Sequence, residues 1–138
     1  MKFEESALSN QYPFTKITLD FGEFYLFEKF VIAEMNYGIH LSWSKIKEAI
    51  KVILLHYGEN YKIGYISNKT NSYSFEPNLW SKFFENYDFI IASATVYYSD
   101  LNYINATLEK QFSSKSVKRA DSLEEAVSWI LNLDEFKE

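Results

Sequence analysis

Polar side chains capable of holding or carrying an anion follow a short strand-like stretch in YISNKTNSYSFEPNLW, residues 65–80. Because the loop leads into Pro77 and a helical pattern, its side chains are expected beside a helix N-terminus. Free backbone N–H groups and the positive end of the helix dipole attract anions there, and nearby hydroxyl groups can bind a phosphate or be phosphorylated. The predicted binding or phosphorylation loop contains Thr70, Ser72, Tyr73, Ser74 and Asn78.

The same loop also has a purely structural interpretation. Asn and Ser favour loops and helix caps through local hydrogen bonds with the backbone, whatever the function. The loop contains no glycine, which disfavours a nucleotide-cradling loop. The sequence therefore leaves a binding loop and a simple connection both open.

Aromatic residues are abundant, with 12 Phe, 11 Tyr and 3 Trp in 138 residues. We expect some tyrosines at the surface, where they supply contact area at low cost in conformational entropy. One group stands where a long apolar strand gives way to a helical pattern, and it could bind a partner or line the rim of the core. This candidate partner surface consists of Tyr97, Tyr98, Ser99 and Tyr103.

Histidines and carboxylates show no catalytic or metal-binding spacing. His40 and His56 stand sixteen positions apart, and the chain has no cysteine, which excludes disulfides, thiolate catalysis and cysteine-ligated zinc. Glu34 interrupts the apolar run FVIAEM, so its carboxylate must face solvent or be paired. We expect it at an exposed edge, with a catalytic acid as the alternative. No catalytic residue, metal or other cofactor is predicted.

The charge distribution excludes two classes of partner. The formal net charge is −5 and Arg119 is the only arginine, so the chain lacks the cationic face that nucleic acids and anionic membranes require. Glu4 and Glu5 stand where a signal peptide would be apolar, and no uncharged stretch is long enough to span a bilayer. The expected location is cytoplasmic.

The elements that must position these residues follow from the hydrophobic periodicity. KITLDF, EFYLFE and FVIAEM, between residues 16 and 35, predict three strands joined by minimal connections, which form an antiparallel meander. A helix capped by Ser42 and closed by Gly58 follows, then strands and helices alternate to the end. The predicted segments are strands 61–67, 89–98 and 116–120, and helices 79–87, 99–112 and 121–131.

The expected fold is α/β, with the meander and the alternating units sharing one mixed sheet. The nearly continuous apolar run FIIASATVYY, residues 89–98, predicts the middle strand of that sheet, covered on both faces. We expect one domain over residues 15–133, a flexible N-terminal tail over 1–14 and a frayed C-terminal tail over 134–138. An edge strand in the meander makes a homodimer possible.

The order of elements and the ending VKRADSLEEAVSWIL resemble the STAS-like family, in particular its SpoIIAA-like group. Members of that group similarly finish with a short strand, a capped turn and a helix; here Asp121 to Glu124 are expected to form a capping box. That helix bears Glu-Ala and then Trp, which are Glu125, Ala126 and Trp129 in this chain. The resemblance covers roughly residues 15–133 and implies an anti-sigma-factor-antagonist-like fold.

The chain departs from the family at its phosphorylation motif. Anti-sigma-factor antagonists carry Asp-Ser-Ser/Thr-Gly at the start of the helix after the middle strand, and the matching stretch here is KTNSYSFEPN. Ser72 and Ser74 occupy the place without the motif. We therefore expect a non-catalytic regulatory module that binds a protein or a small ligand. The alternatives are a pocket for an apolar or lipid-like ligand between sheet and helices, and a small enzyme using His40 or buried carboxylates.

Overall fold

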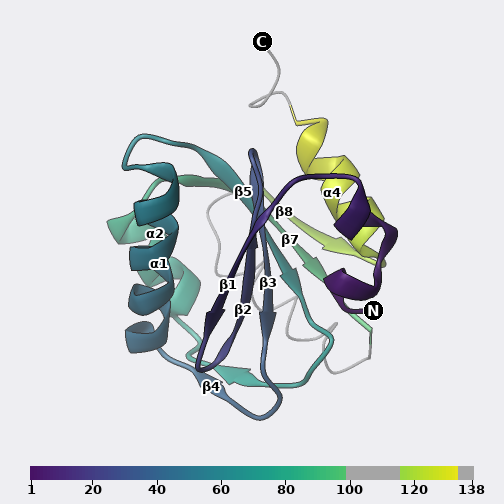
Figure 1. Cartoon of the computed structure of the whole chain (residues 1–138). Coiled ribbons are helices and arrows are strands. Elements are labelled where there is room, and N and C mark those ends of the chain that lie inside the picture. The colour runs from purple at the N-terminus through teal and green to yellow at the C-terminus, as the bar shows by residue number, and fades with distance from the viewer. Residues whose placement is uncertain (99–115, 134–138) are drawn as a thin grey trace.

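The structure, a computed structural model, describes residues 1–98 and 116–133. In that part of the chain, strands form one mixed sheet with helices on both of its faces (Figure 1). The strands of the sheet, in spatial order, are β1 (Thr15–Leu19), β2 (Gly22–Leu26), β3 (Phe30–Met35), β5 (Ile63–Asn68), β7 (Ile90–Val96) and β8 (Ser116–Ala120).

The pairing of the strands confirms the predicted mixed sheet. β1, β2 and β3 pair antiparallel, whereas β3, β5, β7 and β8 pair parallel. FIIASATVYY supplies β7, an interior strand between β5 and β8. Its place is one position off the middle, which β3 and β5 occupy, because only one described strand lies beyond it.

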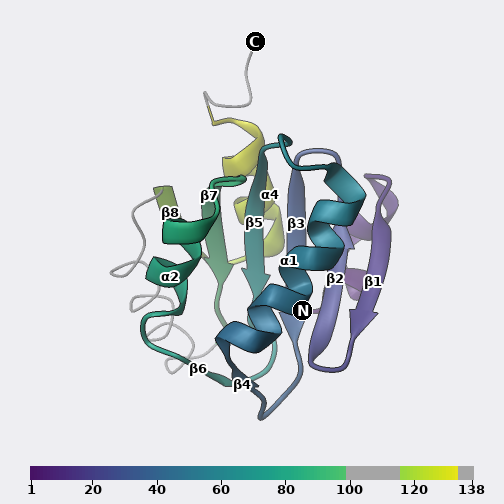
Figure 2. The same cartoon turned by 90° about the vertical axis from the view of Figure 1, so that its left-hand side faces the viewer.

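Helices cover the two faces separately, with α1 (Trp43–Tyr57) and α2 (Leu79–Asn86) on one face and α4 (Leu123–Leu131) on the other (Figure 2). Ser42 caps α1 as predicted, since its Oγ accepts a hydrogen bond from the Lys45 backbone N–H, and Gly58 ends it at a φ of 89°. None of the helices in residues 1–98 and 116–133 is long and apolar enough to cross a membrane.

The cap of α4 lies one residue later than expected. Ser122, not Asp121, is the N-cap, and its Oγ accepts from the Glu125 backbone N–H at 3.1 Å. Glu125 reaches back to accept from the Asp121 N–H, also at 3.1 Å. The Ser122 hydroxyl thus accepts from the N–H three residues ahead, as an N-cap does, while the Glu125 carboxylate accepts from the residue before the cap.

Gly64 allows α4 to approach β5 closely. A Cβ at this position would lie 2.8 Å from both Cγ2 and Cδ1 of Ile130, which is closer than carbon atoms pack. The absence of a side chain at Gly64 thus sets how closely α4 can pack against the sheet.

The N-terminal segment differs from the predicted flexible tail. Residues Phe3–Glu5 and Ala7–Asn10 form two 3-10 helices, η1 and η2, on the α4 face of the sheet (Figure 1). Phe3 and Leu8 are buried there beside Tyr25 and Phe27. α4 is short, so apolar side chains of the meander on this face need a second cover, which the N-terminal segment provides.

A second, two-stranded sheet was not predicted. β4 (His40–Leu41) and β6 (Ser74–Phe75) pair in parallel, next to the ends of β3 and β5. Two residues are too few to show a periodic pattern. The helix predicted after β7, which Ser99 would cap, and the frayed tail from Asp134 lie outside the described residues.

Candidate functional site

The carboxyl ends of β3, β5 and β7 meet at one edge of the sheet, because these strands are parallel neighbours. We call this the carboxyl edge. The loops that leave it contain β4, β6 and the predicted binding loop, and they lie at the bottom of Figure 1. Open α/β sheets place their ligands at such an edge.

Buried polar groups form a network on the α4 side of this edge. The Glu34 carboxylate on β3 accepts hydrogen bonds from the Phe3 backbone N–H at 2.7 Å and from Asn68 Nδ2 at 2.6 Å. Asn68 Nδ2 also donates to the Met1 carbonyl, and Asn68 Oδ1 accepts from the Tyr98 hydroxyl at 2.7 Å. The network therefore ties the N-terminal segment to the ends of three strands.

Burial raises the pKa of the Glu34 carboxyl, and the hydrogen bonds from Phe3 and Asn68 oppose that rise only in part. Burial, with the Glu34 charge as a second cause, raises the pKa of Tyr98 to about 12. Glu34 is only 6% exposed, so the expected edge exposure was wrong. The alternation of β3 turns this side chain inward, where the N–H groups of Phe3 and Asn68 both donate to Glu34 Oε2.

A second buried cluster lies on the α1 side of the edge. Lys69 Nζ donates to the Tyr73 hydroxyl at 2.6 Å, and that hydroxyl lies 3.3 Å from Ser67 Oγ. The lysine also lies over the faces of the Tyr73 and Phe75 rings, 4.1 and 5.4 Å from their centroids. Tyr73 is buried in the core, so its side chain is not available as a contact at the surface of the predicted loop.

The exposed rim carries a hydrogen-bonded histidine and serine. His40 on β4 and Ser74 on β6 are register partners, and His40 Nδ1 lies 2.8 Å from Ser74 Oγ. That distance suits a base and a nucleophile. Both side chains are exposed, and in the described part of the chain no carboxylate orients the histidine, as a serine nucleophile would require.

The other residues of the predicted loop do not converge on one ligand. Thr70 Oγ1 is buried without a hydrogen bond among the described residues, the Ser72 carbonyl accepts from the Gly38 N–H, and Asn78 is the exposed N-cap of α2. A carboxylate oxygen of Glu76 lies 3.4 Å from the Trp43 backbone nitrogen, at the start of α1. This negative charge opposes an anion between the two helix N-termini.

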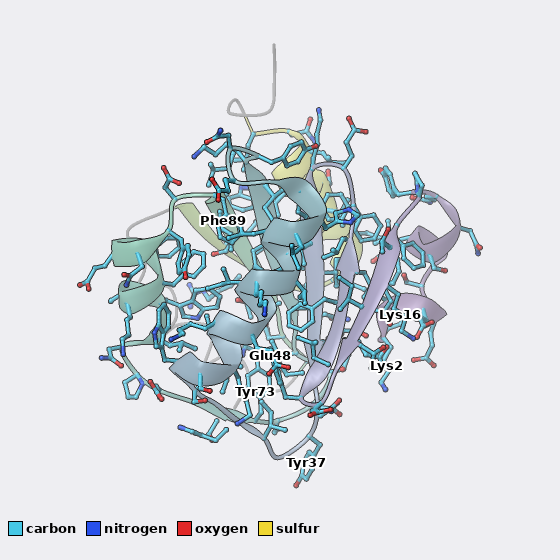
Figure 3. The ribbon with its side chains drawn as sticks, turned by 60° about the vertical axis from the view of Figure 1, so that its left-hand side comes forward. Lys2, Lys16, Tyr37, Glu48, Tyr73 and Phe89 are labelled. Atoms are coloured by element: carbon cyan, nitrogen blue, oxygen red, sulfur yellow. The ribbon has the colours of Figure 1, made fainter. Side chains whose placement is uncertain are left out.

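Of the candidate partner surface, Tyr97 is half-buried and Tyr98 is 42% exposed, while Ser99 and Tyr103 lie outside the described residues. Tyr37, 79% exposed at the tip of the turn after β3, was missed (Figure 3). Its signal in the sequence is the pair Tyr37-Gly38, because Gly38 adopts a φ of 76° that favours glycine in a turn.

Neither a metal site nor a large apolar cavity lies beside these clusters in residues 1–98 and 116–133. No group of three or more His, Asp or Glu side chains in that part of the chain could hold a metal ion. The void between the sheet and the helices α1 and α2 has a volume of about 20 Å³, far below the ~300 Å³ of a small-molecule pocket. This finding argues against an apolar ligand at that place.

Neither the protein-family profiles nor the curated proteins that were compared with the chain gave a match. A solved structure, that of an uncharacterised protein of the DUF3478 family from Shewanella loihica PV-4, is described as having a SpoIIAA-like fold. It aligns with a TM-score of 0.53 and 9% identity over 86% of this chain and 92% of its own. The chain thus has a SpoIIAA-like fold.

Proposed function

We propose that this SpoIIAA-like domain is a non-catalytic protein-binding module that uses the rim of the carboxyl edge. We define this rim by its exposed side chains, Tyr37, His40, Ser74, Asn78 and Tyr98. The observation that carries the proposal is the exposure of 79% of Tyr37, an aromatic ring held out at the edge where α/β sheets bind.

Backbone hydrogen bonds hold in place the turn after β3 that carries Tyr37. The Gly38 N–H donates to the Ser72 carbonyl at 2.9 Å, and the Ser74 N–H donates to the Ile39 carbonyl at 3.0 Å. On the other side of Tyr37, the Asn36 N–H donates to the Phe21 carbonyl at 2.9 Å. Because the backbone is fixed before and after Tyr37, little further ordering of the turn is needed when a partner covers the ring. Tyrosine, with its apolar ring and polar tip, is enriched at protein interfaces.

Binding accounts for the rim better than hydrolysis does. His40 and Ser74 satisfy each other across the β4–β6 pair, and solvent reaches both. An oriented base and a desolvated pocket are what make a serine reactive, and neither supports this pair. We interpret the pair as a polar contact that fixes the register of the rim.

A photo-crosslinking amino acid placed at position 37 tests the proposal directly. The matched control is position 55, because Leu55 on α1 is also 79% exposed and lies away from the carboxyl edge. Expressed in the native host and irradiated, the position-37 protein should give a discrete crosslinked product, visible as one shifted band and identified by mass spectrometry.

The control protein should not give that product. Adding Asn78→Asp and His40→Ala to the position-37 protein should reduce its yield severalfold, since both residues lie on the proposed rim. Equal products from positions 37 and 55, or none from position 37, would refute the rim as a binding face.

A further inference from the structure

A pocket at the opposite edge of the sheet, beside the amino ends of β3 and β5, plays no part in the proposed function. It has a volume of about 370 Å³ and lies between the start of β1, the β2–β3 turn and the end of α1. This volume is within the range of small-molecule sites. The side chains that matter for its chemistry are Phe14, Phe27, Glu28, His56, Tyr57 and Tyr61.

Aromatic rings dominate this pocket. Tyr57 and Tyr61 stack with their centroids 5.0 Å apart and their planes 13° from parallel. Phe14 lies 5.6 Å from Phe27 across the β2–β3 turn, and His56 meets Tyr57 edge-on at 4.7 Å. Phe14 and Tyr61 are 36% and 38% exposed, so solvent and ligands can reach these two rings.

The hydroxyl groups of both tyrosines already donate hydrogen bonds to backbone carbonyl groups. The Tyr57 hydroxyl donates to the Phe27 carbonyl, and the Tyr61 hydroxyl donates to the Glu28 carbonyl. Burial raises the pKa of Tyr57, so its ring stays a neutral phenol. With their polar tips held by the turn, both residues offer the pocket ring surface rather than hydrogen-bonding groups.

The charge at the pocket is negative. Glu28 is exposed at its rim, and the described residues that line it include no lysine or arginine. A smaller hollow of about 200 Å³, on the other side of Pro13 and Phe27, is lined by Lys29 as well as Glu28. The lining of the larger pocket thus combines aromatic faces with the Glu28 carboxylate and includes no lysine among the described residues.

We propose that this pocket binds a small organic cation of the quaternary-ammonium type. Such a cation is attracted to the faces of aromatic rings and needs no hydrogen-bond acceptor, which matches rings whose hydroxyls are engaged. The Glu28 carboxylate adds charge complementarity at the rim. A phosphorylated form such as phosphocholine fits less well, because its phosphate would lie near Glu28 and be repelled.

The test compares three probes by calorimetric titration of the purified protein. Choline should bind, its uncharged isostere 3,3-dimethylbutan-1-ol should bind about 3- to 30-fold more weakly, and phosphocholine should also bind more weakly than choline. Equal affinity for choline and the uncharged isostere would overturn the proposal, as would no binding of choline.

Two pairs of variants locate the site. Tyr61→Phe keeps the ring and should retain choline binding, whereas Tyr61→Leu should lose most of it. Glu28→Gln should weaken binding, whereas Glu48→Gln, which removes an equal charge from α1 about two turns before His56, should not. Choline should also shift the ring resonances of Phe14 and Tyr61, and their failure to move would place any binding elsewhere.

Discussion

Phe3→Ala is expected to lower the free energy of unfolding by about 3–5 kcal/mol, the range for truncating a buried phenylalanine. Phe3 is fully buried and touches three rings, with centroids 5.0 Å from Phe14, 4.6 Å from Tyr25 and 5.3 Å from Phe27. Its removal leaves a cavity on the α4 face that rigid neighbouring rings cannot fill. Urea titration followed by circular dichroism measures the change.

Leu55→Ala is the matched control, since Leu55 is 79% exposed and its truncation should change the free energy of unfolding by less than about 0.5 kcal/mol. If Phe3→Ala were as mild as the control, the first residues would be the flexible tail that the sequence suggested, and the packing described above would be wrong.

Glu34→Leu is expected to destabilise the protein by about 2–4 kcal/mol, because it leaves the Phe3 N–H and one hydrogen of Asn68 Nδ2 buried without an acceptor. Glu34→Gln keeps a carbonyl oxygen that can accept both hydrogen bonds, so its stability at neutral pH should stay within about 1 kcal/mol of the wild type. Glu48→Leu, on the exposed side of α1, should be nearly neutral.

The comparison of wild type with Glu34→Gln also predicts a pH dependence. Because the folded pKa of Glu34 is raised above 4.5, the folded protein binds the proton more tightly than the unfolded chain does. The wild type should therefore lose stability relative to Glu34→Gln as pH rises from about 4.5 through the folded pKa. Denaturant titrations at several pH values measure this difference, and a difference independent of pH would contradict a titrating, buried Glu34.

The sequence predicted elements whose pattern is long and self-contained. Trp43, Ile46, Ile50 and Ile53 recur at helical spacing between a serine cap and Gly58, and α1 has the predicted bounds. FVIAEM forms β3 with its predicted limits. Short connections between the first strands predicted the antiparallel meander, and the helices between the later strands predicted their parallel pairing.

What the sequence could not predict depends on contacts between distant segments. Phe3 shows no periodicity of its own, and its burial depends on rings that lie more than ten residues away. The sequence suggested an exposed edge for Glu34, because the groups that donate hydrogen bonds to its carboxylate belong to Phe3 and Asn68, which lie more than 30 positions away. At the candidate site, the sequence named both Ser74 and His40 but did not predict that they pair, because a two-residue ladder joins them across 34 positions.

The most direct test of the binding rim is the affinity of this protein for its purified partner. Crosslinking at position 37 identifies that partner. Tyr37→Ser should weaken that affinity by about tenfold or more, the loss typical of an aromatic side chain central to an interface. Leu55→Ser, which removes an equally exposed side chain from α1, should leave it unchanged. If the two variants bound the partner as tightly as the wild type, the carboxyl edge would not be the binding face.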